Sequence, residues 1–212
     1  MPKIKLPTKS PHIDMTPMVD LFSVVLTFLM LTATMRQPEP AVVDTPNSIS
    51  EKPTPNHDVM TILISKDGKV FLNVDNEQDT LLHYREKILT EMGKQYNVDF
   101  TPAELREFGK NPSSLGVPME KMKEFLDTKD APAKKVFQIG IPIDTLNNQL
   151  ASWVLYCRQV NPQVSACIKG DSKTEFPIVK KVLDILQDKN VNRFDLITNL
   201  EAVKITEANT PK

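Results

Sequence analysis

An apolar run from Met15 to Met35, near the start of the chain, restricts the fold more than any other feature. At roughly twenty residues, it has the length that an α-helix needs to cross the hydrocarbon core of a bilayer. Asp20 is the only ionisable residue within it. A carboxylate at mid-membrane costs about 2.5–3.5 kcal/mol on insertion scales, so its presence indicates a function.

The hydroxyl residues of the run share a helical face with this acid. At about 100° per residue, a sector roughly 60° wide contains Thr16, Asp20, Ser23, Thr27 and Thr34. A polar stripe on one side predicts contact with a second protein or with a file of water. Under the alternative interpretation Asp20, about 7.5 Å into the helix, only reaches the head-group layer, and the hydroxyls bond to their own backbone carbonyls.

The segment that leads into this run resembles a family signature. The residues from His12 to Asp20, HIDMTPMVD, followed by the apolar run, are similar to the ExbD/TolR family of proton-driven inner-membrane motor subunits. The resemblance implies that Asp20 carries the proton. It also implies a homodimer inside a ring of an ExbB/TolQ-like polytopic protein, a TonB/TolA-like energy transducer as the second partner, and the inner membrane of a Gram-negative bacterium as the location.

The charges beside the run predict its orientation. Lys3, Lys5 and Lys9 precede it, whereas acids dominate after Arg36, so we expect a cytoplasmic N-terminus and a periplasmic C-terminal domain. A cleavable signal peptide is the competing interpretation. The acid in the apolar run, the prolines before it and a poor cleavage site after it argue against cleavage.

Residues 37–57 are predicted to form a flexible tether. The chain has 17 prolines and six glycines, and this segment combines proline with little apolar content, which favours an extended linker. Val42 and Val43 interrupt it. They are tentative partner-binding residues, because a short apolar patch can add as a strand to a partner's sheet edge, although such an interruption often has no role.

The remainder of the chain predicts a small α/β domain. Residues 59–65 and 70–74 flank Asp67-Gly68, a strong hairpin signal. Apolar periodicity predicts a helix over 80–92 that ends at Gly93, a short helix opened by a Thr101–Glu104 capping box, and a third that begins at Pro118. Further along we expect an extended segment at 136–141, a helix capped by Asp144, a strand at 164–169, a helix at 175–189 and a last strand at 194–200.

The predicted fold class is therefore α+β, with a single N-terminal transmembrane helix. The expected parts are a cytoplasmic tail (1–14), the transmembrane helix (15–36), the tether (37–57), a periplasmic domain (58–204) and a C-terminal tail (205–212). The domain would combine the hairpin with a strand-helix-strand unit. Residues 75–143 form a helical insert that does not match the short connection usual in the family, and its role stays open.

Catalytic chemistry has no visible basis in the sequence, so we expect no enzyme, no cofactor and no metal. The three histidines are scattered, and phosphate-binding and nucleophile motifs are missing. A net charge of −1 gives no bias toward nucleic acid. Cys157 and Cys167 fit a disulfide or two buried thiols equally well.

The main rival to the motor subunit is a membrane-anchored periplasmic binding or sensor protein in which the span serves only as an anchor. A flagellar-type stator subunit is closer to the motor subunit than this rival is, but no peptidoglycan-binding module is recognisable after the span.

Overall fold

The computed structural model describes residues 15–32, 39–50, 55, 58–75, 83–110 and 114–200. The chain divides into two compact units, Met1–Gln37 and Pro38–Lys212. The first unit contains one described element, helix α1 (Thr16–Thr32), of 17 residues. No helix among the described residues combines the length and the apolar character that crossing a membrane requires.

Helix α1 has an apolar surface that its own unit does not cover. None of its residues is buried, and Asp20 is its only ionisable residue. The exposed apolar side chains, most of them more than half exposed, are Met18, Val19, Leu21, Phe22, Val24, Val25, Leu26, Phe28, Leu29, Met30 and Leu31. A surface of this kind marks a site that lipid or another protein chain covers.

The second unit is built on a four-stranded sheet with the order β3-β2-β4-β5. The strands are β2 (Val59–Ile64), β3 (Val70–Val74), β4 (Ser165–Gly170) and β5 (Phe194–Leu196). β2 and β3 form the predicted antiparallel hairpin, whose turn places Gly68 at a φ of +74°. β4 pairs in parallel with β2 and with β5, as the predicted strand-helix-strand crossover requires.

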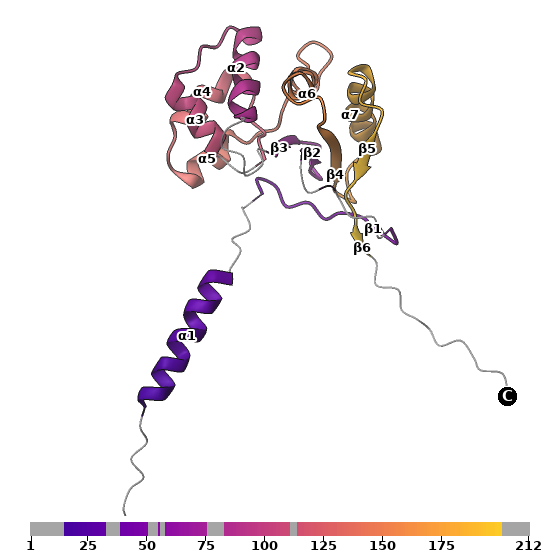
Figure 1. Ribbon diagram of the computed structural model, residues 1–212. Helices are drawn as coiled ribbons and strands as arrows, with labels where there is room; N and C mark the ends of the chain where they lie inside the picture. Colours follow the sequence, from indigo (N-terminus) through magenta and orange to yellow (C-terminus); the bar gives the residue numbers. More distant parts are fainter. Residues whose placement is uncertain are drawn as a thin grey trace, which may run out of the picture. The chain divides into compact units, whose positions relative to one another are not determined.

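Helices lie over one face of this sheet and beside it (Figure 1). They are α2 (Tyr84–Tyr96), α3 (Pro102–Lys110), the 3₁₀ turn η1 (Met119–Lys121), α4 (Met122–Asp127), α5 (Ala131–Phe137), α6 (Gln149–Val160) and α7 (Phe176–Asp188). Apart from α1, the described chain therefore forms the predicted mixed α+β fold with a small sheet. The helices α2 to α5 belong to the region that the sequence marks as an insert.

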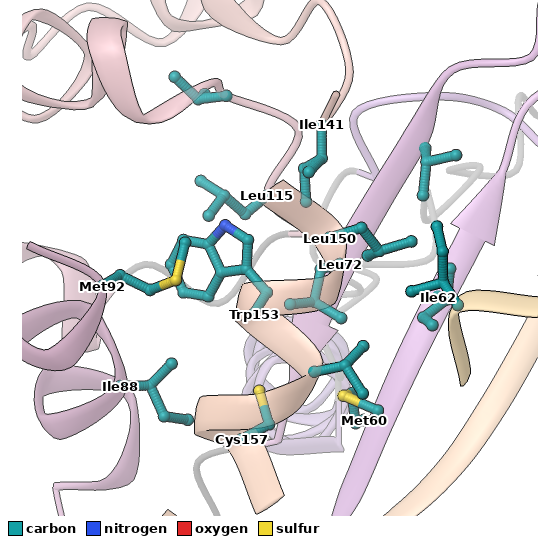
Figure 2. Packing of buried hydrophobic residues seen from close by; sticks show 14 of the residues in the cluster. Met60, Ile62, Leu72, Ile88, Met92, Leu115, Ile141, Leu150, Trp153 and Cys157 are labelled. Atoms are coloured by element: carbon teal, nitrogen blue, oxygen red, sulfur yellow. The ribbon is translucent and has the colours of Figure 1, made fainter. Parts of the chain in front are cut away.

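Trp153 of α6 lies where the insert meets the sheet. Its side chain is 1% exposed and is surrounded by Leu72 of β3, Met92 of α2 and Leu115 (Figure 2). The ring of Phe108, from α3, is stacked 6.1 Å away between centroids. In the described part of the chain, the indole Nε1–H has no hydrogen-bond partner. The insert thus shares one hydrophobic core with the sheet and α6.

A buried arginine ties helix α2 to this core. Arg85 is 5% exposed, and its guanidinium carbon lies 5.1 Å from the centroid of the Phe108 ring. Burial of the cation lowers its pKa to about 10, and this effect outweighs the opposing influence of Asp75. The group remains charged at neutral pH, and the aromatic face beneath it is a favourable neighbour for a cation.

Several local predictions are confirmed. The Thr101–Glu104 capping box is present, because the Thr101 backbone N–H donates to the Glu104 carboxylate at 2.5 Å. That bond is also the largest cause of the lowered pKa of Glu104. The segment after Pro118 buries Met119, Met122, Phe125 and Leu126 in the core, as its periodicity predicted.

The predicted boundaries of α2 and of the last strand are wrong. α2 continues through Gly93 to Tyr96 and ends at Asn97, which adopts the left-handed conformation at φ 53°. Its predicted first residues, 80–82, lie outside the described residues. The last strand divides into β5 and a short β6 (Asn199–Leu200) that pairs with a different neighbour.

Two predictions between residues 130 and 150 are wrong. The expected extended segment at 136–141 begins inside helix α5, which proline near its first residue helps to start. Asp144 does not cap the following helix. Asn148 caps α6 instead, through its Oδ1, which accepts from the Ala151 N–H at 3.0 Å. Leu146 consequently falls in the preceding loop and is fully exposed.

Candidate functional site

The first candidate site is the acidic face of α1. Thr16, Asp20 and Ser23 border one shallow groove along the helix, together with Pro17 and Val19. Among residues 15–32, no hydrogen bond or ion pair engages the Asp20 carboxylate. The helix therefore presents an unpaired carboxylate beside a hydroxyl group, between exposed apolar side chains.

The other predicted members of the polar face differ from these. The Thr27 hydroxyl donates to the backbone carbonyl of Val24 at 2.8 Å, so its own helix satisfies it. Thr32, which was not predicted, donates in the same way to Phe28 at 2.9 Å. Thr34 lies outside the described residues. Of the predicted face, Thr16, Asp20 and Ser23 border the groove, and Thr27 keeps its place on the same side of the helix.

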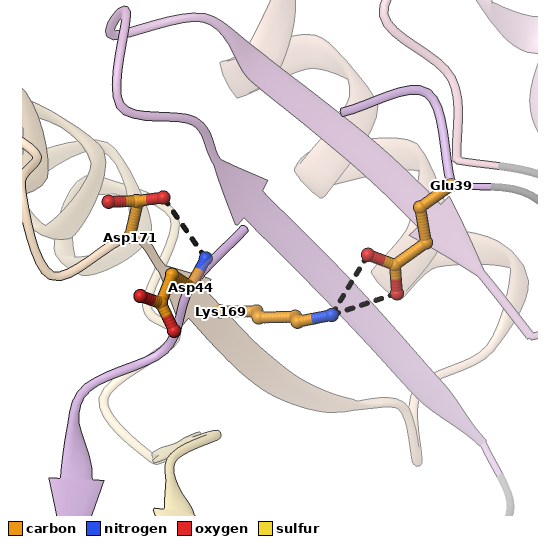
Figure 3. A network of polar contacts seen from close by, with 4 residues as sticks. All are labelled: Glu39, Asp44, Lys169 and Asp171. Atoms are coloured by element: carbon orange, nitrogen blue, oxygen red, sulfur yellow. Dashed lines mark hydrogen bonds and ion pairs between the residues drawn. The ribbon is translucent and has the colours of Figure 1, made fainter. Parts of the chain in front are cut away.

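The second candidate site is the segment 39–50, which lies along the sheet of the second unit. Its first contact is an ion pair in which the Lys169 Nζ lies 2.8 and 2.9 Å from the two carboxylate oxygens of Glu39 (Figure 3). Ile168 of β4 packs in the core with the helices, so Lys169, the next residue, points to the opposite face of the sheet. Residues in this part of the predicted tether thus contact the folded unit.

Asp171, directly after β4, holds the middle of the segment (Figure 3). Its Oδ2 accepts from the Asp44 backbone N–H at 3.0 Å, and the Ser172 N–H donates to the Asp44 carbonyl at 2.8 Å. Its Oδ1 accepts from the Lys173 N–H at 2.9 Å. The hydrogen bonds from Lys173 and then Asp44 lower the pKa of Asp171, because they stabilise its charged form.

The end of the segment adds a short parallel strand. β1 (Asn47–Ser48) pairs with β6, and the Asn199 N–H donates to the Pro46 carbonyl at 3.0 Å. Of the two valines predicted to bind a partner, Val42 is 91% exposed whereas Val43 is partly buried. Only Val42 is thus fully presented to solvent while the segment is in place.

A groove of about 450 Å³ lies between this segment, the hairpin turn and the turn after β4. It is lined by charged side chains of both signs, among them Lys66, Asp67, Lys69, Asp171 and Lys173, with Phe71 as an apolar part of the wall. In the described ranges, no group of His, Cys, Asp and Glu is arranged to hold a metal ion. The groove thus suits contact with polar chain segments.

The two cysteines are buried on different elements and no disulfide joins them. Cys157 lies on α6 and Cys167 on β4. Burial raises the pKa of the Cys157 thiol to about 12, so the group is protonated and unreactive at neutral pH.

Sequence reasoning missed Asp171, Lys169 and Asn199 as residues that hold the segment 39–50. The pattern IKGD at 168–171 did contain a signal, since an aspartate between a strand and a helix often accepts hydrogen bonds from nearby backbone N–H groups. Nothing in the pattern indicated that one of those N–H groups would come from a residue 127 positions earlier.

These observations define a protein of two parts. An apolar helix with a single acid comes first in the chain. An α+β unit follows, and the segment 39–50 lies along its sheet. The family model of the biopolymer transport protein ExbD/TolR matches residues 7–201. The chain therefore belongs to the ExbD/TolR family of biopolymer transport proteins. Comparison with curated proteins and with solved structures gives no match.

Proposed function

We propose that the chain is an ExbD-like subunit of a motor driven by the proton-motive force, and that Asp20 carries the protons. The observation that supports this most directly is the Asp20 carboxylate, unpaired among residues 15–32, on a helix whose other large side chains are apolar and exposed. An ionisable group in such surroundings is functional by default. The proposal includes a single span at 15–36, a cytoplasmic N-terminus and a periplasmic domain at 58–204.

The mechanism needs only that Asp20 exchange between an apolar and a hydrated environment. A carboxyl group is neutral in the first and ionised in the second, so it can take up a proton on one side and release it on the other. Each elementary charge that crosses the membrane releases about 2.3 kcal/mol per 100 mV. Repeated over many protons, this energy biases the rotation of one set of subunits against another.

The surroundings of Asp20 would come from other subunits. We propose that two copies of α1 lie inside a ring of an ExbB/TolQ-like polytopic protein in the inner membrane, where the groove of Thr16, Asp20 and Ser23 faces polar groups of the ring. The second unit would then engage a TonB/TolA-like energy transducer. Val42, exposed on the segment 39–50, is a candidate contact for that partner.

The test compares Asp20→Asn with Thr32→Val in cells that also contain the polytopic partner. Asp20→Asn keeps the shape of the side chain and removes its ability to bind and release a proton. We therefore expect normal co-purification with the partner and complete loss of energised uptake or envelope integrity. Thr32→Val is the matched control, because this threonine lies outside the predicted polar face and its hydroxyl bonds to its own helix. We expect it to retain both assembly and activity.

Full activity of Asp20→Asn would refute proton carriage by this residue. It would favour the alternative of an anchored binding or sensor protein, for which the acid is dispensable. Loss of co-purification in Asp20→Asn would instead assign the carboxylate to assembly.

A further inference from the structure

The insert bonds to the outer edge of β3 at two positions, Leu115 and Ile141. Leu72 and Leu115 exchange both backbone hydrogen bonds, each 2.7 Å between nitrogen and oxygen, in an antiparallel bridge. The Ile141 N–H donates to the Val70 carbonyl at 2.8 Å. Val70 and Leu72 lie two residues apart on the strand, so their backbone N–H and C=O groups point to the same side. That side is the outer edge of β3, away from β2.

Further hydrogen bonds and packing support these two contacts. The Gly116 N–H donates to the Gln138 Oε1 at 2.6 Å, and the Gly140 N–H donates to the Gly116 carbonyl at 2.8 Å. Leu115 and Val117 are buried in the shared core. Gly116 lies against the ring of Phe71, and a Cβ at this position would come within 2.1 Å of it. The contact with β3 is therefore a built feature of the fold.

The opposite edge of the sheet has no such cover in the part of the chain that the structure describes. β5 is the terminal strand there and pairs only with β4. Leu196 of β5 is 61% exposed. Within the described residues the two edges of the sheet thus differ, since β3 bonds to the insert whereas β5 pairs with no strand other than β4.

We propose that the insert acts as an intramolecular edge cover, which closes β3 against strand pairing with a second copy of this chain. An exposed edge presents unpaired N–H and C=O groups that can pair with any extended chain, and proteins commonly cover such edges. Closing β3 is a role for residues 114–141 that does not depend on Asp20 or on proton movement. Its test is therefore independent of the proposed function.

The experiment uses the full chain in detergent with Leu115→Pro, which removes the N–H that binds Leu72. Hydrogen exchange measured by NMR follows the Leu72 amide, and light scattering follows the mass across a concentration series. We expect exchange at Leu72 to quicken at least about tenfold, together with new concentration-dependent association. Leu196→Pro, which alters the β5 edge, is the control and should show neither change.

A second substitution separates edge pairing from general misfolding. Adding Asn73→Lys to Leu115→Pro places a charge on β3, so it should restore the original mass if the chains associate through this edge. Gln138→Ala removes only the support of Gly116 and should give a smaller change in the same direction. The proposal is overturned if Leu72 becomes exposed without association, if its protection persists in Leu115→Pro, or if Asn73→Lys has no effect.

Discussion

At the scale of single residues, Asp171 does the most to connect distant parts of the chain. Its two carboxylate oxygens accept from the backbone N–H groups of Asp44 and Lys173. These bonds are stronger to the charged form of the carboxyl, which is why its pKa lies below the ordinary value of 3.8. The attachment of the segment 39–50 is therefore coupled to the protonation of one side chain.

We expect acid to release this segment. Because the bond from Asp44 contributes to the lowered pKa of Asp171, attachment is at full strength above the ordinary value of 3.8 and weakens as the pH falls through the lowered pKa. The amide NMR signal of Asn199, which donates to Pro46, should report the release. In Asp171→Asn the segment should already be loosened at pH 7, and the change in acid should be smaller, because the Glu39–Lys169 ion pair still holds the segment.

An Asn199 signal that does not move in acid, or an unchanged signal in Asp171→Asn, would contradict this coupling. A full return of the signal after neutralisation is the control that excludes acid denaturation.

At the scale of elements, close packing between the insert and the sheet depends on one glycine. Phe71 of β3 occupies the space that a side chain at position 116 would need. Gln149 of α6 adds polar contacts to the same junction, since its Oε1 accepts from the Met119 N–H and its Nε2 donates to Glu120, both at 2.9 Å. The insert is thus joined to the sheet and to α6 by packing and by hydrogen bonds.

Gly116→Ala should lower the free energy of unfolding by about 1–3 kcal/mol, because the added methyl group displaces the buried Phe71 ring. Gly170→Ala is the matched control, since a Cβ there would meet no atom within 4 Å. It should change stability by less than about 0.5 kcal/mol. Urea unfolding followed by circular dichroism measures both, and equal effects of the two substitutions would rule out the packing argument.

The elements that could be predicted are those with strong local signals. Asp67-Gly68 between two apolar runs and the capping box at Thr101 each contain their own turn or cap chemistry, and both are confirmed. The helix α5 could not be predicted, because its sequence APAKKVF has little apolar periodicity and its Lys134 contacts Glu107 and the ring of Phe125, which lie elsewhere in the sequence. The bridge between Leu72 and Leu115 had no local signal for the same reason.

At the scale of the whole molecule, the two units differ in whether their apolar side chains are exposed or buried. α1 exposes its apolar residues, whereas the second unit buries a continuous core. The sequence predicted this division and the acid on α1. It did not predict that residues 39–50 contact the folded unit, because proline-rich composition describes the local stiffness of a segment and not the backbone groups that it meets elsewhere.

We expect the second unit to fold without the first. A chain of residues 38–212 should unfold cooperatively, at a temperature within about 3 °C of the corresponding transition in the full chain, because none of the residues of α1 is buried. Differential scanning calorimetry measures both transitions. A loss of cooperativity, or a much lower midpoint in the shorter chain, would show that the first unit contributes to the stability of the second.

Trp153 of α6 is the only tryptophan in the sequence, and its ring lies where the insert meets the sheet. Its fluorescence therefore comes from one known place, without labelling and without competing indole signals. An apolar, enclosed ring emits at shorter wavelengths than a hydrated one, so any rearrangement that separates the insert from the sheet during assembly would appear as a red shift. The native chain thus carries its own optical probe of this junction.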